Sequence, residues 1–260
     1  MTNRNTAATS IAGSPSSYVE LNRGDWIPVN YDQVIYDPAG YDAFIWNLQK
    51  PVVVGLICSM AAGGRPLKYL DFACGTGRII AEIEQLVTEA VGLDTSEDML
   101  SFARKKLRHA ALKCGNLLED PGVVSGEYDV ITAFRFFLNT EAETRIAVMS
   151  SLARRVTHPE GRLIFNVHGN RWSSLLLMSI YQRMRGWGPA TTMSYDQARR
   201  LVESADLEID SWYGFGLWPR RLYRSRLAPL IRSVDRWALR QRALRWVSHD
   251  MLFVCRPKAR

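Results

Sequence analysis

One stretch of the chain, Tyr69–Arg78, constrains the fold more than any other. An apolar run leads into the carboxylate of Asp71, a glycine-rich turn follows, and an apolar-periodic helix is predicted from Ile79. A second apolar run ends in Asp94. A tight strand-to-helix turn with an acid about 20 residues farther on is how an α/β domain begins a nucleotide-like pocket, because the second carboxylate can hold ribose hydroxyls. The stretch therefore predicts an α/β enzyme with a nucleotide-like cofactor.

The glycines narrow the choice of cofactor. Gly75 and Gly77 form a G-x-G pair, but Ile80 stands where a dinucleotide-binding turn has its third glycine. That glycine lets the helix pack closely on the strand and brings a pyrophosphate to the helix N-terminus. Its absence argues against NAD and FAD. The chain also lacks the G-x-x-x-x-G-K-[ST] pattern, which excludes a P-loop.

Five segments, in the right order and at the right spacing, resemble the motifs of the class I S-adenosylmethionine-dependent methyltransferases of the small-molecule type. The run Leu70–Arg78 is similar to motif I of that family, and it is followed by Gly92–Leu100, Cys114–Leu118, Glu127–Phe134 and Gly161–Asn166. The resemblance covers roughly residues 65–170. It implies the fold of the family and the cofactor S-adenosylmethionine, and it is silent on the substrate.

The resemblance also implies cofactor contacts residue by residue. Asp71 would face the methionyl ammonium group, and Asp94 would accept from both ribose hydroxyls, which suits a carboxylate with two oxygens. Asn116 stands where the family often has an aspartate that accepts from the adenine amino group, and an amide oxygen can still accept that bond. The other expected contacts are Ala73, Gly75 and Gly77 in the turn, Thr95, Met99 and Leu117 near the adenine, and Phe134 on the methionyl side.

The rest of the pattern alternates between strands and helices. We expect strands at 68–72, 89–93, 110–114, 128–134 and 161–167, with helices at about 77–87, 96–108 and 141–156. This alternation predicts right-handed crossovers and a parallel sheet. Two further strands at 207–215 and 250–256 predict a terminal antiparallel hairpin. The expected fold class is α/β, a Rossmann-like, doubly wound, seven-stranded and mostly parallel sheet with an N-terminal cap and helical insertions.

A single methyltransferase domain is expected over residues 18–260, because this length suits one α/β domain with an added cap. Residues 1–17 predict a disordered tail. Residues 18–62 form the N-terminal cap, a tyrosine-rich segment that either packs on the core or covers the active site, and 51–62 fit a buried helix or a strand. Residues 63–170 form the cofactor-binding core, with helical insertions near the acceptor site at 171–193 and 217–247.

Three polar residues are candidates for the acceptor side, because ligands of open α/β sheets bind beyond the carboxyl ends of the strands. Arg135 and Asn139 follow the fourth strand and His168 follows the fifth. His168 is the candidate general base, since a histidine is largely neutral at pH 7; the alternative is a loop histidine bonded to a backbone carbonyl. Arg135 either binds an anionic group of the acceptor or pairs with a nearby carboxylate.

The segment from Pro219 to Trp246 is strongly basic. It holds nine arginines and one acid, Asp235, with apolar residues interleaved at close to helical spacing. A basic amphipathic helix is typical of contact with a membrane surface or another polyanion. The alternative is an ordinary helix that buries its apolar stripe and leaves the arginines in solvent. No run of about 20 consecutive apolar residues predicts a membrane-spanning segment.

These observations predict transfer of a methyl group from S-adenosylmethionine to a small hydrophobic or amphiphilic acceptor, such as a natural product, a quinone-like aromatic or a lipid-linked sugar, and at oxygen. Such an in-line displacement needs mainly proximity and orientation. The alternatives are an RNA methyltransferase that uses the arginine-rich insertion, and a non-catalytic protein that binds S-adenosylmethionine. Four scattered cysteines without metal-like clustering predict reduced thiols, no metal, and a cytoplasmic protein that could contact an anionic membrane surface.

Overall fold

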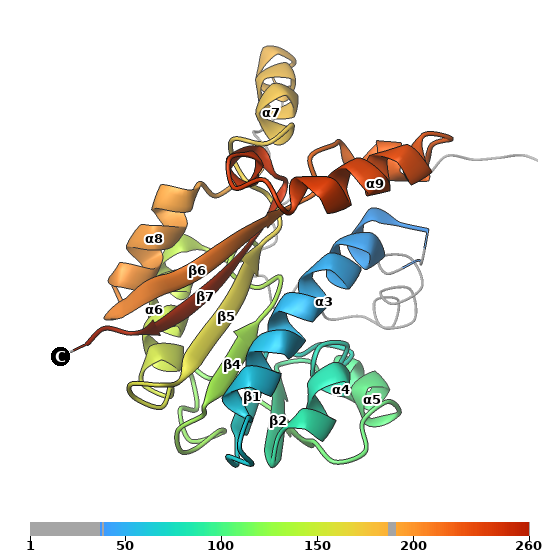
Figure 1. Ribbon diagram of the computed structural model, residues 1–260. Helices are drawn as coiled ribbons and strands as arrows, with labels where there is room; N and C mark the ends of the chain where they lie inside the picture. Colours follow the sequence, from blue (N-terminus) through green and yellow to red (C-terminus); the bar gives the residue numbers. More distant parts are fainter. Residues whose placement is uncertain (1–36, 38, 187–190, 260) are drawn as a thin grey trace, which may run out of the picture.

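The computed structural model describes residues 37, 39–186 and 191–259. Its centre is a seven-stranded sheet in the order β3-β2-β1-β4-β5-β7-β6 (Figure 1). The strands β1 to β5 run parallel, and β7 is antiparallel to both β5 and β6. The predicted fold class, with its terminal antiparallel hairpin, is therefore confirmed. The strands are β1 (Lys68–Phe72), β2 (Glu89–Asp94), β3 (Ala111–Cys114), β4 (Val130–Ala133), β5 (Arg162–Val167), β6 (Leu207–Phe215) and β7 (Asp250–Pro257).

The order of the strands reverses between β1 and β4. The chain builds outward through β2 and β3 and then returns to pair β4 with the free side of β1. All four residues of β4 are buried, as expected for a central parallel strand covered on both faces. A ligand of an open α/β sheet binds at this reversal, beyond the carboxyl ends of the strands.

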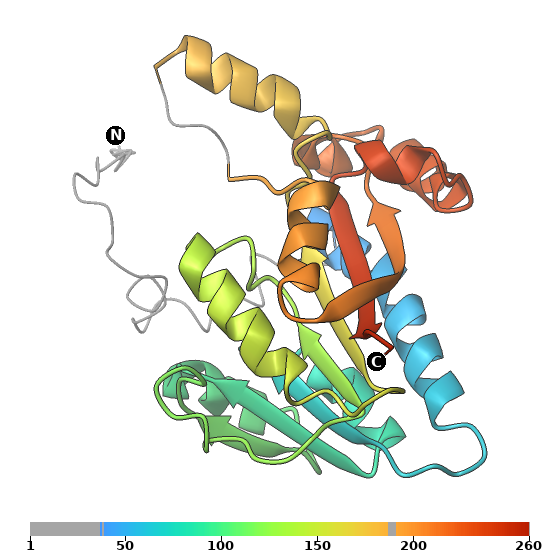
Figure 2. The same cartoon turned by 90° about the vertical axis from the view of Figure 1, so that its left-hand side faces the viewer.

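Helices cover both faces of the sheet. Figures 1 and 2 show α3, α4 and α5 against one face and α6 and α8 against the other. One buried cluster joins α6 and α8 to the sheet, and a second joins α3 and α4 to the opposite face. The helices of the two layers are α3 (Tyr41–Met60), α4 (Ile80–Ile83), α5 (Glu97–Arg104), α6 (Ala142–Ala153) and α8 (Tyr195–Glu203).

The helix predicted at 77–87 is shorter than expected. It consists of α4, followed by the 3-10 turn η2 (Glu84–Leu86). The carboxylate of Glu84 accepts hydrogen bonds from the backbone N–H groups of Arg108, His109 and Ala110. Hydrogen bonding lowers the pKa of Glu84 although burial alone would raise it. These bonds tie η2 to the chain that leads into β3.

The helix α3 is the apolar helix to compare with the prediction that no segment spans a membrane. By length and composition alone, Tyr41–Met60 is long and apolar enough to cross a membrane. It is not a consecutive apolar run, because Asp42, Asn47, Gln49 and Lys50 interrupt it. In the fold the helix lies along the sheet and buries one side, which confirms the helical interpretation of 51–62. Its buried residues are Tyr41, Phe44, Ile45, Trp46, Gln49, Val53 and Ile57.

The basic segment 219–246 is not one helix. It forms the 3-10 turn η3 (Arg220–Arg224), the helix α9 (Ala228–Ala238) and the 3-10 turn η4 (Leu244–Val247). Pro229 lies in the first turn of α9, where its missing N–H costs no helical bond. The earlier insertion forms α7 (Leu175–Met184), which Figures 1 and 2 show standing away from the sheet.

The division into tail, cap, core and insertions stays a prediction. The tail 1–17 lies outside the described residues, as do Tyr18, Tyr31 and Tyr36 of the predicted cap.

Candidate active site

The turn between β1 and α4 adopts a conformation that favours glycine. Gly75 and Gly77 have φ angles of 54° and 77°, and Ala73 has a φ of 55°. A Cβ on Gly77 would lie 2.9 Å from the Cβ of Ala103, so that glycine lets α5 pack closely. A Cβ on Gly75 would meet nothing within 4 Å, so the space above that residue is open. The turn thus presents bare backbone to a ligand.

Asp71 is the buried carboxylate of the turn. Its Oδ1 accepts a hydrogen bond from the Thr132 hydroxyl at 2.6 Å, and its Oδ2 accepts from the Ile80 N–H at 3.2 Å. Burial raises its pKa to about 7, although both hydrogen bonds act in the opposite direction. A bound ammonium group would favour the charged form of this carboxylate.

Asp94 ends β2 and holds the turn from the other side. Its Oδ2 accepts from the Gly75 N–H at 2.7 Å, and its Oδ1 accepts from the Ser96 N–H at 2.9 Å. Burial raises its pKa. A carboxylate offers about four lone-pair positions, so both oxygens can still accept from a pair of hydroxyls.

The residues predicted near the adenine follow the ends of β2 and β3. Met99 and Leu117 are buried, whereas Thr95 is exposed. The side chain of Asn116 is already engaged in its own turn, since Oδ1 accepts from the Leu118 N–H at 3.0 Å and Nδ2 donates to Glu119 at 2.8 Å. The oxygen of Asn116 keeps one further lone pair for an adenine amino group.

A narrow cavity extends from the turn toward the end of β4. Its lining comprises Asp71, Ala73, Cys74, Gly75, Thr76, Arg78, Ile79, Phe134 and Arg135. Phe134 meets Trp46 of α3 edge to face at 5.7 Å, and the guanidinium group of Arg78 lies 4.6 Å from the Trp46 ring. Two carboxylates, open backbone at Gly75 and this aromatic wall fit the ammonium, ribose and methionyl parts of S-adenosylmethionine.

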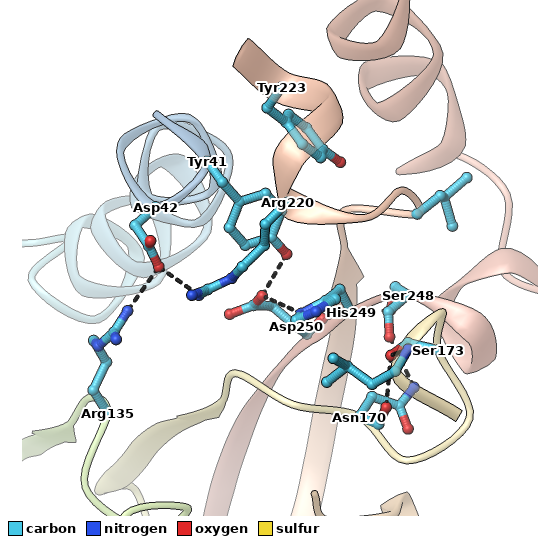
Figure 3. Close-up of polar contacts among 12 residues, drawn as sticks. Tyr41, Asp42, Arg135, Asn170, Ser173, Arg220, Tyr223, Ser248, His249 and Asp250 are labelled. Atoms are coloured by element: carbon cyan, nitrogen blue, oxygen red, sulfur yellow. Dashed lines mark hydrogen bonds and ion pairs between the residues drawn. The ribbon is translucent and has the colours of Figure 1, made fainter. Parts of the chain in front are cut away.

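One carboxylate holds two arginines at the acceptor side of the cavity. Oδ1 of Asp42, on α3, lies 2.7 Å from Nη1 of Arg135 and 2.7 Å from Nη2 of Arg220 (Figure 3). Arg135 follows β4 with a φ of 59°, and its N–H donates to Oδ1 of Asn166 at 2.6 Å. The structure thus shows one of the two roles considered for Arg135, the pairing with a nearby carboxylate.

His168 and Asn139, the other two candidates for the acceptor side, lie near Arg135 and differ in burial and hydrogen bonding. Burial lowers the pKa of His168 to about 3, and the positive charges of Arg135 and Arg220 act in the same direction. Its Nδ1 is buried and has no hydrogen-bond partner within the described residues. Asn139 is exposed, and its amide donates to the backbone oxygen of Arg135 at 2.6 Å. Asn139 therefore shapes the turn after β4; its catalytic role stays a prediction.

A buried polar network behind Asp42 was missed by the sequence analysis. The Tyr41 hydroxyl donates to Oδ2 of Asp250 at 2.5 Å, and Nδ1 of His249 lies 3.4 Å from the same oxygen (Figure 3). The Arg220 guanidinium also lies 4.8 Å from the Tyr41 ring. In the sequence, Tyr41 belongs to the tyrosine-rich segment of the predicted cap, and nothing there points to His249 or Asp250. The reversed direction of β7 brings His249 and Asp250 to the carboxyl edge of β5.

Comparisons with known proteins agree with this geometry. A family model described as a methyltransferase domain matches residues 70–161. YqeM of Bacillus subtilis, a protein named as a methyltransferase, is 33% identical over 107 residues, which span 40% of this chain and 43% of YqeM. The chain thus aligns with less than half the length of that relative.

Two longer matches extend the similarity. An uncharacterized methyltransferase of Schizosaccharomyces pombe is 25% identical over 250 residues, covering 80% of this chain and 94% of that protein. The crystal structure of magnesium protoporphyrin IX methyltransferase from Synechocystis PCC 6803, with bound S-adenosylhomocysteine, has a TM-score of 0.60 and 16% identity, and covers 90% of this chain and 97% of that one.

The sheet order and the glycine turn with its two carboxylates define an α/β fold built around a nucleoside cofactor. Together with the family model matched over residues 70–161, they support a class I S-adenosylmethionine-dependent methyltransferase, an enzyme whose cofactor is S-adenosylmethionine.

Proposed function

We propose that the protein transfers a methyl group from S-adenosylmethionine to an oxygen of a small hydrophobic or amphiphilic acceptor, and that this oxygen enters the site as an anion. The observation that carries the proposal is the pairing of Arg135 and Arg220 with Asp42 beside the cavity. Guanidinium groups bind carboxylates and other oxyanions with charge-assisted hydrogen bonds. An anionic acceptor would compete with Asp42 for these two groups.

The cofactor side of the proposal uses the two carboxylates of the turn. When bound, S-adenosylmethionine supplies an activated methyl group. Asp71 would pair with the methionyl ammonium group and Asp94 would accept from the ribose hydroxyls. The surrounding contacts would come from Ala73, Gly75, Gly77, Thr95, Met99, Asn116, Leu117 and Phe134.

The lowered pKa of His168 makes this residue poorly suited to remove a proton from the acceptor. An imidazole with a pKa of about 3 is a weak base near pH 7. An acceptor oxygen that is already ionised needs no base, and Arg135 and Arg220 stabilise its charge. In this proposal the unpartnered Nδ1 of His168 accepts a hydrogen bond from the acceptor and orients it. The general-base role predicted from the sequence is the alternative that the pH profile distinguishes.

The apolar part of the acceptor has a surface to occupy at the same end of the molecule. An open groove there is lined by Trp172, Ser173, Ser174, Leu176, Leu217, Trp218, Leu244 and Val247. This lining supports an amphiphilic rather than a fully polar acceptor.

We place the enzyme in the cytoplasm, with a peripheral contact to an anionic membrane surface.

A panel of matched acceptors tests the proposal. The protein would be incubated with methyl-labelled S-adenosylmethionine and with amphiphilic carboxylic acids and acidic phenols, each paired with its neutral amide or ether. Label in extracted products from the acids but not from their neutral partners would support it. Label in amines or in RNA would contradict it, and cofactor binding without transfer to any extract of cells would favour the non-catalytic alternative.

A further inference from the structure

The positive charge of the chain is concentrated in two insertions. Residues 171–186 and 217–247 contain twelve arginines, no lysine and one acid, Asp235. Their net charge of +11 exceeds the +7 of the whole chain, so all other residues together carry −4. Asp235 is buried and takes no part in the outer surface, since it accepts from the Tyr223 hydroxyl and from the Leu217 N–H.

The same two insertions hold most of the exposed apolar side chains. Of the fourteen large hydrophobic residues that are exposed in the described part of the chain, eleven belong to them. We call these eleven residues and the exposed arginines around them the arginine–tryptophan face. Its apolar members are Trp172, Ile180, Tyr181, Met184, Trp218, Leu227, Leu230, Trp237, Leu239, Trp246 and Val247, and its exposed arginines include Arg171, Arg183, Arg221, Arg226, Arg236, Arg240 and Arg242.

The helix α9 shows that this exposure is patterned. Ile231 and Ala238 point into the core and are buried. Leu227, Leu230 and Trp237 lie on an adjacent stripe of the helix, at spacings of three and seven residues, and are 58%, 63% and 56% exposed. A helix at the surface of a soluble domain normally turns polar residues outward at such positions. This helix therefore has two apolar stripes, of which only one is covered.

The face lies at one end of the molecule. Figures 1 and 2 both show α7 and α9 at the end toward which β4 and β5 point, which is the end of the acceptor site. The groove lined by Trp172, Trp218 and Val247 joins the two insertions. Arg220 of η3 connects the face to the acceptor site, because it pairs with Asp42.

We propose that the arginine–tryptophan face docks on the surface of an anionic lipid bilayer. A basic surface with a large apolar component binds at the interface, where arginines meet anionic headgroups and apolar side chains enter the acyl boundary. Tryptophan is enriched at this depth in membrane proteins, and four tryptophans of this face are exposed.

Two other occupants fit the face less well. RNA would use the arginines and stack on the tryptophans, but it offers nothing to the exposed aliphatic residues Ile180, Met184, Leu227, Leu230, Leu239 and Val247. A second copy of the chain in a symmetric dimer would set one +11 surface against another, and like charges oppose that contact. An anionic bilayer satisfies both the charge and the aliphatic residues.

The inference deepens the membrane contact of the proposed function by naming the surface that makes it, and it does not rest on methyl transfer, because vesicle binding needs neither cofactor nor acceptor. The full chain would be floated with vesicles of phosphatidylcholine alone or with about 30% phosphatidylglycerol, at low and at high salt. We expect anionic vesicles to bind at least about tenfold more tightly, with binding weakened but not abolished at high salt, since salt screens only the charge contribution.

Two pairs of substitutions test the two components. Leu230→Ser with Trp237→Ser removes apolar contacts, and Arg226→Glu with Arg240→Glu reverses two exposed charges. Each pair should lower partition onto anionic vesicles by about tenfold or more. The matched control, Ile146→Ser with Arg154→Glu, changes an exposed apolar residue and an exposed arginine in and just after α6, away from the face. This control should bind as the unchanged protein does.

Three results would overturn the inference. The first is equal vesicle binding by all variants, measured on proteins whose circular dichroism and thermal transitions match. The second is binding to RNA in a shift assay without binding to vesicles. The third is a dimer in light scattering that Leu230→Ser with Trp237→Ser dissociates, again without vesicle binding.

Discussion

Tyr41 and Asp250 lie 209 positions apart in the sequence and share a buried hydrogen bond of 2.5 Å. The bond joins the first turn of α3 to the start of β7, and Tyr41 is the sequence neighbour of Asp42, whose carboxylate holds Arg135 and Arg220. Although burial alone would raise it, the pKa of Asp250 is lowered by His249 and by the Tyr41 hydroxyl. This hydrogen bond therefore holds the first turn of α3 against β7 and favours the charged form of the buried Asp250 carboxylate.

Replacing Tyr41 by phenylalanine should destabilise the fold by about 1–3 kcal/mol, because a buried carboxylate loses a donor. A lowered pKa contributes stability that is present above the unfolded value and is lost as the pH falls through the folded value. The variant should raise the pKa of Asp250 and so move acid unfolding to higher pH. Urea denaturation near neutral pH and an acid titration by circular dichroism would measure both effects. Tyr213→Phe, at a partly exposed tyrosine of β6, is the control.

Asp94→Ala should weaken the binding of S-adenosylmethionine by on the order of 100-fold, because two hydrogen bonds to a charged group are lost. Isothermal titration calorimetry would measure the dissociation constant. Asp98→Ala removes an exposed acid from the first turn of α5 and serves as the control. Equal affinity of the two variants would contradict the assignment of the ribose site.

The raised pKa of Asp71 predicts that binding of the cofactor releases a proton. With a pKa of about 7, much of its carboxyl group is protonated below neutrality, whereas a bound ammonium group requires the charged form. Affinity should therefore rise with pH up to about 7 and become level above it. Calorimetry in buffers of different ionisation enthalpy would count the released protons. Asp71→Asn should bind more weakly and lose this pH dependence; an unchanged slope would show that another group is titrating.

The sheet and the cofactor turn could be predicted because their signals are local. The run Tyr69–Arg78 carries its strand, its carboxylate and its glycines in adjacent positions, and the alternation of strands and helices predicts a mostly parallel sheet. Helix lengths were less predictable. The helix expected at 77–87 gives way to a 3-10 turn at Glu84, whose carboxylate accepts from the backbone of residues 108–110, a contact that periodicity does not show.

The acceptor side could be predicted only in part. His168 and Arg135 were found because polar residues after parallel strands meet at one edge of the sheet. Four other residues of this side come from separate elements and meet only in the folded structure. They are Tyr41 and Asp42 of α3, Arg220 of η3 and Asp250 of β7. The position of Asp250 depends on β7 pairing antiparallel with β5, with Val167 opposite Met251, and a sequence pattern does not contain this register.

Arg220→Gln should raise the KM for an anionic acceptor by roughly tenfold, because one charge-assisted contact is lost. The dissociation constant of S-adenosylmethionine should stay near that of the unchanged protein, since Arg220 is not part of the cavity lining. Arg224→Gln is the matched control, because Arg224 lies in the same turn and pairs with Asp37 instead. A comparable increase in KM for both variants would contradict a specific role for Arg220.

His168 should make the protein sensitive to mild acid through the unfolded state. Its folded pKa of about 3 lies below the ordinary value of 6.5, so between these values the unfolded chain binds a proton that the folded chain does not. Stability should therefore fall as the pH decreases from about 6.5, by roughly 2 kcal/mol at pH 4.5. His168→Gln should lack this loss, whereas His109→Gln, at an exposed histidine, should retain it.

The variant His168→Gln also distinguishes the two roles considered for His168, orientation of the acceptor and general base. If His168 only orients an ionised acceptor, His168→Gln should retain measurable turnover with an unchanged pH profile, whereas a general base would leave a profile that rises with pH over the ionisation of the acceptor itself.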